Sequence, residues 1–242
     1  MSQGLVYPCG MKYEQTFENF VVSATNKIPV IVLKSILTKD GPNRILLYGP
    51  SGSGKTHLLQ ALSRAAESAW PSVSCDSFTG YTLVEEYVCS IQENRAKEFS
   101  DQLHSLDLLL VDDLSLLAFK SETSRFFESL AADTDGPRIV ATSPINLDSA
   151  SGFTTKLVHE ISQGVTVQLT EADEETARAI LWEHTSRAGL NLTREAVATI
   201  AETVGTNGHR LVGAVETLRA HVMQQEAEIE PDLVSRILTV DI

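Results

Sequence analysis

The stretch RILLYGPSGSGKTHLLQA, residues 44–61, decides the fold of this chain. Its first part, Ile45–Tyr48, is an apolar run that predicts a buried strand, and its last part predicts a helix that begins near Lys55. Between the two, Gly49–Thr56 fits the pattern G-x-x-x-x-G-K-[ST] of a phosphate-binding loop. The pattern and its flanking elements together predict a P-loop, the name used below for Gly49–Thr56.

The P-loop residues meet the demands of phosphate binding. Glycines let the backbone curl so that successive N–H groups point at an anion, and the following helix adds its positive dipole end. Lys55 is expected to neutralise the β and γ phosphates of ATP or ADP, and the Thr56 hydroxyl to ligate Mg²⁺. The alternative is a Ser- and Gly-rich loop that only connects strand to helix, but the flanking elements argue against it. The predicted nucleotide-binding residues of the loop are Gly49, Pro50, Ser51, Gly52, Ser53, Gly54, Lys55 and Thr56.

A second motif, Leu108–Asp113, is an apolar run that ends in two carboxylates. Such a strand brings its acids to the carboxyl edge of a parallel sheet, where the P-loop also lies. Asp112 is predicted to bind Mg²⁺, usually through water, and Asp113 to polarise an attacking water as general base. With Lys55, Asp113 forms the predicted catalytic pair. Paired acids after an apolar run are also common helix caps or turn residues, which is the alternative reading.

Short apolar runs alternate with amphipathic stretches as far as residue 169. The alternation predicts an α/β fold, with a parallel sheet covered on both faces by helices. The predicted strands are 44–49, 73–75, 107–112, 138–143 and 164–169, and the predicted helices begin at Lys55 and span about 82–104 and 121–132.

From Ala172 onward the pattern changes to helices alone. Helices are predicted over 173–187, over 193–204 with Thr193 as N-cap, and over about 208–226. Pro231 suits the first position of a short terminal helix. The predicted domains are therefore a flexible tail at 1–15, a nucleotide-binding α/β domain at 16–170, and a helical lid at 171–242.

The composition of the chain limits the cellular compartment and the partners that are expected for it. The net charge of −13 opposes tight binding to duplex DNA, because that affinity comes from cations that displace counterions. Three scattered cysteines fit neither a disulfide framework nor a metal cluster and favour a reducing compartment. The N-terminus lacks the pattern of a signal peptide, and no window is apolar enough for a membrane span. We therefore expect a cytoplasmic protein without membrane contact.

With both motifs placed, the chain from Thr16 to its C-terminus resembles the AAA+ domain of the DnaA/Hda-type replication initiator family. Thr16–Val22, followed by Asn26, is similar to the family's N-terminal segment beside the adenine. The other matching stretches are Gly54–Ala61 and Asp107–Leu114 (Walker A and B), Tyr81–Phe99 (initiator-specific helices) and Asn207–Val215 (the sensor 2 helix of the lid).

This resemblance implies a five-stranded AAA+ core and a three-helix lid, with ATP or ADP and Mg²⁺ bound between them. It implies that Phe20 and Val21 lie against the nucleotide and that His57, directly after the P-loop, also contacts it. In the lid, it implies a sensor 2 role for Arg210 or for His209, which occupies the family's arginine position. The other interpretation of Arg210 is a solvated lid residue.

The chain also departs from the family's pattern. Where the family has an arginine finger, ungapped matching places His159-Glu160-Ile161, and an acid cannot stabilise the γ-phosphate of a neighbour's ATP. Pro144 stands where the sensor 1 segment usually has Asp. The chain ends at Ile242, about where the family's helix-turn-helix DNA-binding domain begins, so sequence-specific duplex recognition is not expected.

The N-terminal tail contains Gln3-Gly4-Leu5-Val6-Tyr7, which is loosely similar to the sliding-clamp motif of DnaA-related regulators. It departs from that motif at Gly4, and a disordered tail is the favoured interpretation.

Two functions are weighed for the chain. The leading hypothesis is an ATP- or ADP-binding protein in replication initiation or its regulation, acting through contacts with replication proteins and with weak or absent hydrolysis. The expected partners are a DnaA-like initiator, a sliding clamp or a helicase, with nucleotide-dependent self-association as the family's assembly mode. The alternative is an active ATPase that remodels or loads a helicase on single-stranded DNA. Arg95 and Lys97 are outnumbered by acids in their region, which predicts weak or absent single-strand binding.

Overall fold

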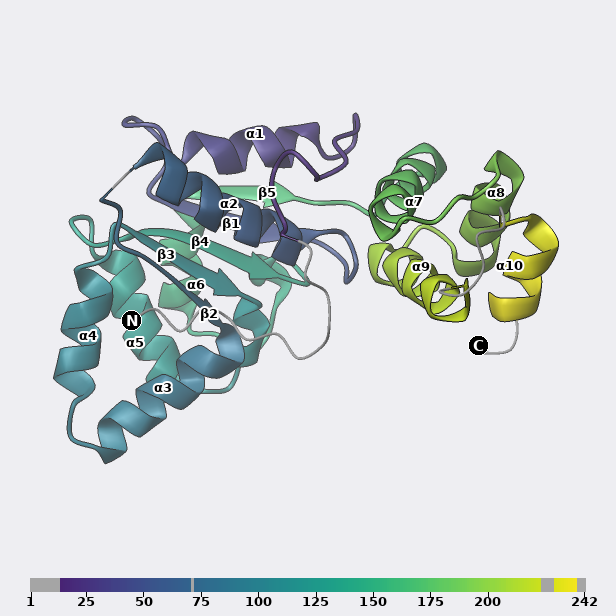
Figure 1. The fold of residues 1–242 in the computed structure, drawn as a ribbon. Coiled ribbons are helices and arrows are strands. Elements are labelled where there is room, and N and C mark those ends of the chain that lie inside the picture. Colours follow the sequence, from purple (N-terminus) through teal and green to yellow (C-terminus); the bar gives the residue numbers. More distant parts are fainter. Residues whose placement is uncertain (1–13, 71, 223–228, 239–242) are drawn as a thin grey trace. The chain divides into compact units, whose positions relative to one another are not determined.

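A computed structural model describes residues 14–70, 72–222 and 229–238 of the chain (Figure 1). Gln3–Tyr7 lies outside these residues. The chain forms two compact units. Of the described residues, 14–20, Ile28–Gly49 and those within Lys55–Leu169 belong to the first unit, and Val21–Lys27, Pro50–Gly54, 170–222 and 229–238 belong to the second. The domain limits proposed from the sequence stay a prediction.

The first unit is built on a parallel sheet of five strands in the order β2-β3-β4-β1-β5. The strands are β1 (Arg44–Tyr48), β2 (Cys75–Thr79), β3 (Leu108–Asp112), β4 (Arg138–Ser143) and β5 (Val165–Gln168). This confirms the predicted α/β class with a five-stranded parallel sheet. β3 lies inside the sheet and is buried along its whole length, which explains its unbroken apolar run.

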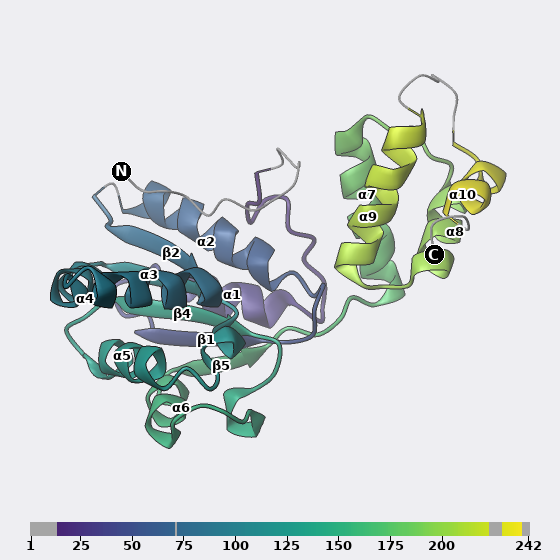
Figure 2. The ribbon, with the colours of Figure 1, turned by 90° about the horizontal axis from the view of Figure 1, so that it is seen from below.

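Both faces of this sheet are covered by helices, as the alternation predicted. On β3, Leu108 and Leu110 face one hydrophobic cluster, and Leu109 and Val111 face the other. Helices α1 (Lys27–Ser35) and α2 (Lys55–Ala69) bury their apolar sides in the first cluster. The second cluster takes side chains from α3 (Gly80–Gln92), α4 (Ala96–His104), α5 (Ser121–Ala132) and α6 (Thr155–Ser162). Figure 2 shows α2 on one side of the sheet and α5 and α6 on the other.

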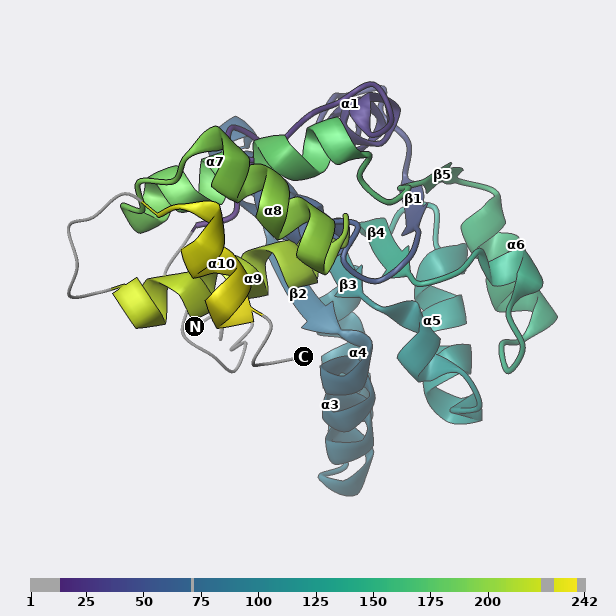
Figure 3. The ribbon, with the colours of Figure 1, turned by 90° about the vertical axis from the view of Figure 1, so that its right-hand side faces the viewer.

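The expected single helix over 82–104 is wrong in detail, because the structure has two helices there. Asn94 has a left-handed φ of 56°, which ends α3 and redirects the chain into α4. At the other end, Thr79 caps α3 with a capping box to Thr82, so α3 begins before residue 82. Figure 3 shows α3 extending beyond the edge of the sheet.

The predicted strand at 73–75 is also displaced, since β2 runs over Cys75–Thr79. All of its residues are half-buried, and it pairs on one side only, with β3. An edge strand does not need an apolar side chain at each position, so the apolar run of Val73-Ser74-Cys75 pointed to the wrong residues.

The second unit contains α7 (Glu174–Ala188), α8 (Arg194–Val204), α9 (Gly208–Val222) and α10 (Pro231–Leu238) around one hydrophobic cluster. Thr193 is the N-cap of α8 and accepts a hydrogen bond from the Ala196 N–H, as predicted. Pro231 begins α10, also as predicted. The described part of α9 ends at Val222.

Among the described residues, no helix is both long and apolar enough to cross a membrane.

Candidate nucleotide site

The P-loop follows β1 at the carboxyl edge of the sheet. Gly52 and Gly54 have φ values of +79° and +100°, a backbone conformation that L side chains rarely adopt. Gly49 has a different constraint, because a Cβ there would lie 1.9 Å from the Leu169 carbonyl oxygen. The three glycines of the P-loop, two of which the motif requires, therefore each have a geometric reason to be glycine.

Ser53 carries a buried polar atom that is not satisfied by the described protein. Its hydroxyl makes no hydrogen bond, whereas its backbone N–H donates to the Pro50 carbonyl oxygen at 3.3 Å. Leaving a buried hydroxyl unpaired is costly, so this atom fits a site that a polar ligand completes.

Lys55 is the first residue of α2, and its ammonium folds back over the start of the P-loop. Its Nζ donates to the Gly49 carbonyl oxygen at 2.7 Å. Burial lowers the pKa of Lys55, and the charges of Asp112 and Asp113 oppose this by favouring the cation. Lys55 is therefore a partly desolvated cation close to two acids, and a polyanion would further favour its charged form.

The next residue, Thr56, begins a chain of hydrogen bonds that crosses from α2 to the sheet. Its hydroxyl donates to Asp112 Oδ2 at 2.7 Å, and the buried Thr142 hydroxyl donates to Asp112 Oδ1 at 2.6 Å. The Asp113 N–H in turn donates to Thr142 Oγ1 at 2.8 Å. Both oxygens of the Asp112 carboxylate are thus held in place. Hydroxyl and carboxylate oxygens are the ligand type that Mg²⁺ prefers, so Thr56 and Asp112 fit a magnesium site.

Asp113 lies in a strained backbone conformation, with φ 65° and ψ 76°. Its Oδ1 accepts hydrogen bonds from the backbone N–H and the hydroxyl of Ser115, so Asp113 caps the short 3-10 helix Leu114–Leu117. The turn role considered from the sequence is therefore present. Strained residues persist where the surrounding structure over-determines them, often at functional sites, and the general-base role stays a prediction.

The N-terminal segment Thr16–Phe20 lies against the first turn of α2. The Thr16 carbonyl oxygen is 2.9 Å from His57 Nε2, and the Phe20 ring meets the His57 ring at a centroid distance of 5.2 Å. Val21 follows in the second unit, where its carbonyl oxygen accepts from Asn26 Nδ2 at 2.9 Å. His57 and Phe20, both predicted to contact the nucleotide, are thus in contact with each other.

The start of α9 carries the predicted sensor 2 residues within the second unit. Asn207 Nδ2 donates to the Ser51 carbonyl oxygen at 2.7 Å, and Asn207 Oδ1 accepts from the backbone N–H groups of His209 and Arg210 at 3.1 and 3.4 Å. His209 Nδ1 is 3.5 Å from the Ser51 hydroxyl, and both His209 and Arg210 are exposed. Of the two sensor 2 candidates, His209 is thus the one with a side-chain contact to a P-loop residue.

The residues at which the sequence departs from the family's pattern are exposed or half-buried. Glu160 is on α6, where its carboxylate accepts from Gln163 Nε2 at 3.1 Å, and Pro144 is exposed directly after β4. In the α3–α4 region, Arg95 forms ion pairs with Glu86, at 3.8 Å, and with Glu93.

Sequence reasoning assigned no role to Thr142, Ser115 or Asn207. Thr142 had a detectable signal, since it is a polar residue that directly follows the apolar run Ile139–Ala141 within a central strand. Nothing in the local sequence marks Ser115, and Asn207 was marked only as the start of the stretch Asn207–Val215 that matches the sensor 2 helix. The hydrogen-bond partners of both residues are set by the folded backbone.

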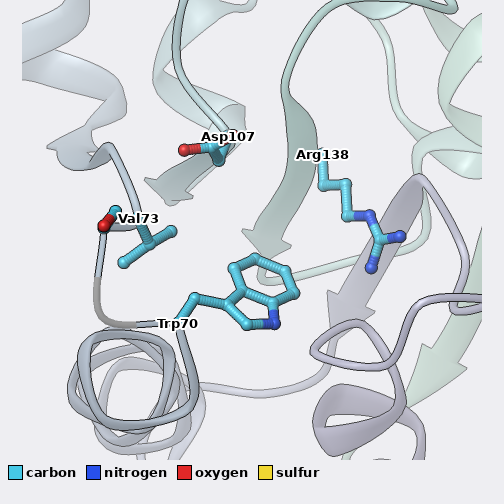
Figure 4. A pocket seen from close by; sticks show the side chains of 5 residues that line it. Trp70, Val73, Asp107 and Arg138 are labelled. Carbon is cyan, nitrogen blue, oxygen red and sulfur yellow. The ribbon is translucent and has the colours of Figure 1, made fainter.

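The other end of the same sheet has an open cavity of about 490 Å³, lined by Trp70, Ser72, Val73, Asp107 and Arg138 (Figure 4). The Arg138 guanidinium donates to the backbone carbonyls of Ile36, Thr38 and Lys39 and lies 5.5 Å from the Trp70 ring centroid. Asp107 Oδ2 accepts from the Ser74 N–H and hydroxyl at 2.8 and 2.7 Å. The charged residues of this cavity are therefore bonded to the protein itself.

A five-stranded parallel sheet in this order, with a P-loop after β1 and an acidic pair at the carboxyl end of β3, defines a P-loop protein of the AAA+ class. More specifically, the chain belongs to the DnaA family: the model of the bacterial DnaA ATPase domain matches residues 11–168, more than half of the chain. The predicted family is thereby confirmed.

Individual curated relatives support the same family assignment. The chromosomal replication initiator protein DnaA of Acinetobacter baylyi is 33% identical over 228 residues, which cover 92% of this chain and 49% of the relative. The DnaA of Borrelia turicatae is 29% identical over 232 residues, which cover 94% and 48%. The chain thus spans about half the length of the curated relatives it matches.

Solved structures are similar over most of the chain. Domain III of the Thermotoga maritima replication initiation protein DnaA has a TM-score of 0.87 and 26% identity, covering 96% of this chain and 98% of that one. AMPPCP-bound DnaA from Aquifex aeolicus has a TM-score of 0.76 and 26% identity, covering 88% and 66%. The Thermotoga maritima RuvB Holliday junction branch migration motor, at 16% identity and a TM-score of 0.70, shows the fold alone.

Proposed function

We propose that this chain binds ATP or ADP with Mg²⁺ and acts in the initiation of chromosomal replication, or in its regulation, through nucleotide-dependent protein contacts. The observation that carries the proposal is the hydrogen-bonded chain Thr56–Asp112–Thr142, which holds a carboxylate beside the Lys55 ammonium. The unpaired Ser53 hydroxyl in the P-loop supports it, as does the AMPPCP-bound relative from Aquifex aeolicus.

In this proposal, different groups bind the phosphates and the metal ion. The Lys55 ammonium and the P-loop N–H groups bind the phosphates, and the Thr56 hydroxyl and Asp112 carboxylate hold Mg²⁺. When bound, Mg²⁺ offsets the charge of the β and γ phosphates. Asp113 is placed next to this group and orients a water only if its carboxylate leaves Ser115.

Turnover is proposed to be weak or absent. Glu160, at the arginine-finger position, carries a negative charge and is bonded to Gln163, so it gives no cation to a neighbouring molecule. Arg95 is paired with two acids, which leaves little positive charge for a single-stranded nucleic acid in the α3–α4 region. The proposed partners are therefore proteins: a DnaA-like initiator, a sliding clamp or a helicase.

Binding is tested by thermal unfolding of the chain with ATP, ADP or neither, each with and without Mg²⁺. A ligand that binds the native state at about 100 times its Kd stabilises it by about 2.7 kcal/mol, so a clear rise in Tm is expected with either nucleotide. The same Tm with and without millimolar nucleotide contradicts the proposal.

Turnover is tested by the hydrolysis rate per molecule over a range of protein concentrations, with light scattering to follow self-association. The expected result is a low rate that does not increase with concentration. A steep increase would instead support the alternative, an active ATPase with an assembly-supplied arginine that remodels or loads a helicase on single-stranded DNA.

A further inference from the structure

Two consecutive carbonyl oxygens of the P-loop are hydrogen-bonded to the start of α9. The Ser51 carbonyl accepts from Nδ2 of Asn207, the residue directly before α9, at 2.7 Å. The Gly52 carbonyl accepts from the Gly208 N–H at 3.0 Å. Both pairs lie within the second unit, which contains Pro50–Gly54 as well as α9. The middle of the loop is therefore bonded to the beginning of a helix that follows it by more than 150 residues in the sequence.

This contact is so close that it leaves no room for side-chain atoms on either glycine. A Cβ at Gly52 would lie 2.3 Å from Asn207 Oδ1, and a Cβ at Gly208 would lie 2.4 Å from the Gly52 carbonyl oxygen. Asn207 is itself held, because its Oδ1 accepts from the N–H groups of His209 and Arg210 at 3.1 and 3.4 Å. Asn207 thus uses one end of its amide for the first turn of α9 and the other end for the P-loop.

Holding a carbonyl also sets the direction of the N–H group in the same peptide. A trans peptide is planar, and its C=O and N–H groups point in opposite directions. Since Asn207 binds the Ser51 carbonyl, the Gly52 N–H of the same peptide is turned away from Asn207, and among the described residues it has no backbone acceptor. N–H groups attract an anion, whereas carbonyl oxygens repel it. Asn207 therefore keeps the attractive end of this peptide available to a phosphate.

We propose that Asn207 is a positioning residue that holds the P-loop in its phosphate-binding conformation, with the Gly208 N–H as the second contact. The proposal rests on the proposed nucleotide binding and gives the start of α9 a role in the affinity for every polyphosphate. A cationic side chain that reached the γ-phosphate would favour ATP over ADP. Asn207 acts through the backbone of the loop instead, so ATP, ADP and a polyphosphate without a base are affected alike.

The test is titration calorimetry of the full chain with ATP, ADP and inorganic tripolyphosphate, each with Mg²⁺. Asn207→Ala removes one hydrogen bond to the loop and is expected to weaken binding of all three ligands by about three- to tenfold. Gly208→Ala places a Cβ against the Gly52 carbonyl and is expected to weaken binding of all three by about tenfold. In both variants the ratio of ATP to ADP affinity is expected to stay within about twofold of the wild type.

Asn207→Asp separates the contact with the loop from the stability of α9. A carboxylate still accepts from the N–H groups of the first helical turn, but it cannot donate to the Ser51 carbonyl. The free chain is therefore expected to melt at a higher Tm than Asn207→Ala, while all three affinities fall at least as far. The ratio of wild-type to variant affinity should persist in about 0.5 M salt, because salt screens an added charge but does not restore a donor.

Thr193→Ala is the matched control for a lost helix cap in the same unit. Thr193 caps α8 by accepting from the Ala196 N–H at 3.1 Å. Its loss is expected to lower the Tm of the free chain and to leave all three affinities unchanged.

Three results overturn the inference. They are wild-type affinities in folded Asn207 and Gly208 variants, weaker binding of ATP without weaker binding of ADP and tripolyphosphate, or equal weakening in Thr193→Ala. If Asn207→Ala or Gly208→Ala does not fold, Asn207→Asp decides alone. A wild-type chain that binds none of the three ligands contradicts the proposed function itself, whereas wild-type binding with unchanged variants contradicts only the role of Asn207.

Discussion

The two ends of the central sheet both carry charged and polar side chains, yet they differ in what those side chains bind. At the amino edge, Arg138 donates to backbone carbonyls and Asp107 accepts from Ser74. At the carboxyl edge, Asp112 binds two side-chain hydroxyls, and burial lowers the pKa of Lys55. The charged side chains at the amino edge form hydrogen bonds within the protein, whereas those at the carboxyl edge lie beside a glycine-rich loop.

This difference shows that charge and a concave surface do not define a site. The cavity at the amino edge is lined by an arginine, an aspartate and a tryptophan (Figure 4), but Arg138 there fixes the turn after α1. A buried or partly buried charge whose partners are all backbone groups stabilises the fold. A desolvated cation next to two acids at a P-loop is the arrangement that an anionic ligand completes.

The largest effect is expected for Lys55→Ala at the carboxyl edge. Removing the ammonium deletes the charge that faces the phosphates, so the rise in Tm with ATP or ADP should disappear. Lys120→Ala, which removes an exposed lysine at the start of α5, is the matched control and should keep the full shift. A normal shift in Lys55→Ala would contradict the contrast between the two edges.

The next largest effect is expected for Thr142→Val, which keeps the shape of the side chain but removes its hydroxyl. The buried Asp112 Oδ1 and Asp113 N–H each lose a partner, which should lower the free energy of unfolding by about 1–3 kcal/mol. The affinity for ATP should fall in the presence of Mg²⁺ and change less in EDTA. Denaturant melts measure the free energy of unfolding, and calorimetry measures the affinity for ATP. Thr142→Ser should restore both quantities.

Arg138→Ala tests the amino edge and should affect stability alone. The loss of hydrogen bonds to three carbonyls and of the Trp70 contact should cost about 1–3 kcal/mol, or roughly 2–4 °C in Tm for each kcal/mol. Affinities for ATP and ADP should match the wild type. A variant that unfolds normally but loses nucleotide would show that the cavity takes part in binding.

The smallest effect is expected in the pH dependence of binding. Burial lowers the pKa of Lys55 from its usual 10.5, and a bound triphosphate should raise it again. Binding then takes up a proton at alkaline pH, so affinity should be level below the pKa of the free protein and fall as the pH rises through it. Calorimetry in alkaline buffers of different ionisation enthalpy should detect this uptake, and Arg138→Ala should show the same profile as the wild type.

Much of the fold follows from short-range patterns. The P-loop motif placed β1 and the start of α2, and the apolar run before Asp112 placed a central strand. The N-cap Thr193 and the first-position Pro231 placed two helices of the second unit. The errors fall where the local pattern is weak. β2 is a half-buried edge strand, and the break between α3 and α4 depends on the backbone conformation of Asn94.

The sequence by itself determined that this chain has a P-loop, an acidic strand end and the DnaA family's AAA+ domain, because these depend on residues that are neighbours along the chain. Only the tertiary structure decided that Thr142 donates a hydrogen bond to Asp112 and that His57 contacts Thr16 and Phe20. It also decided that Arg138 donates to the backbone after α1. Each of these contacts joins residues at least 30 positions apart. Hydrogen bonds and ring contacts depend on distance and direction, and for such pairs both are set by the packing of strands and helices.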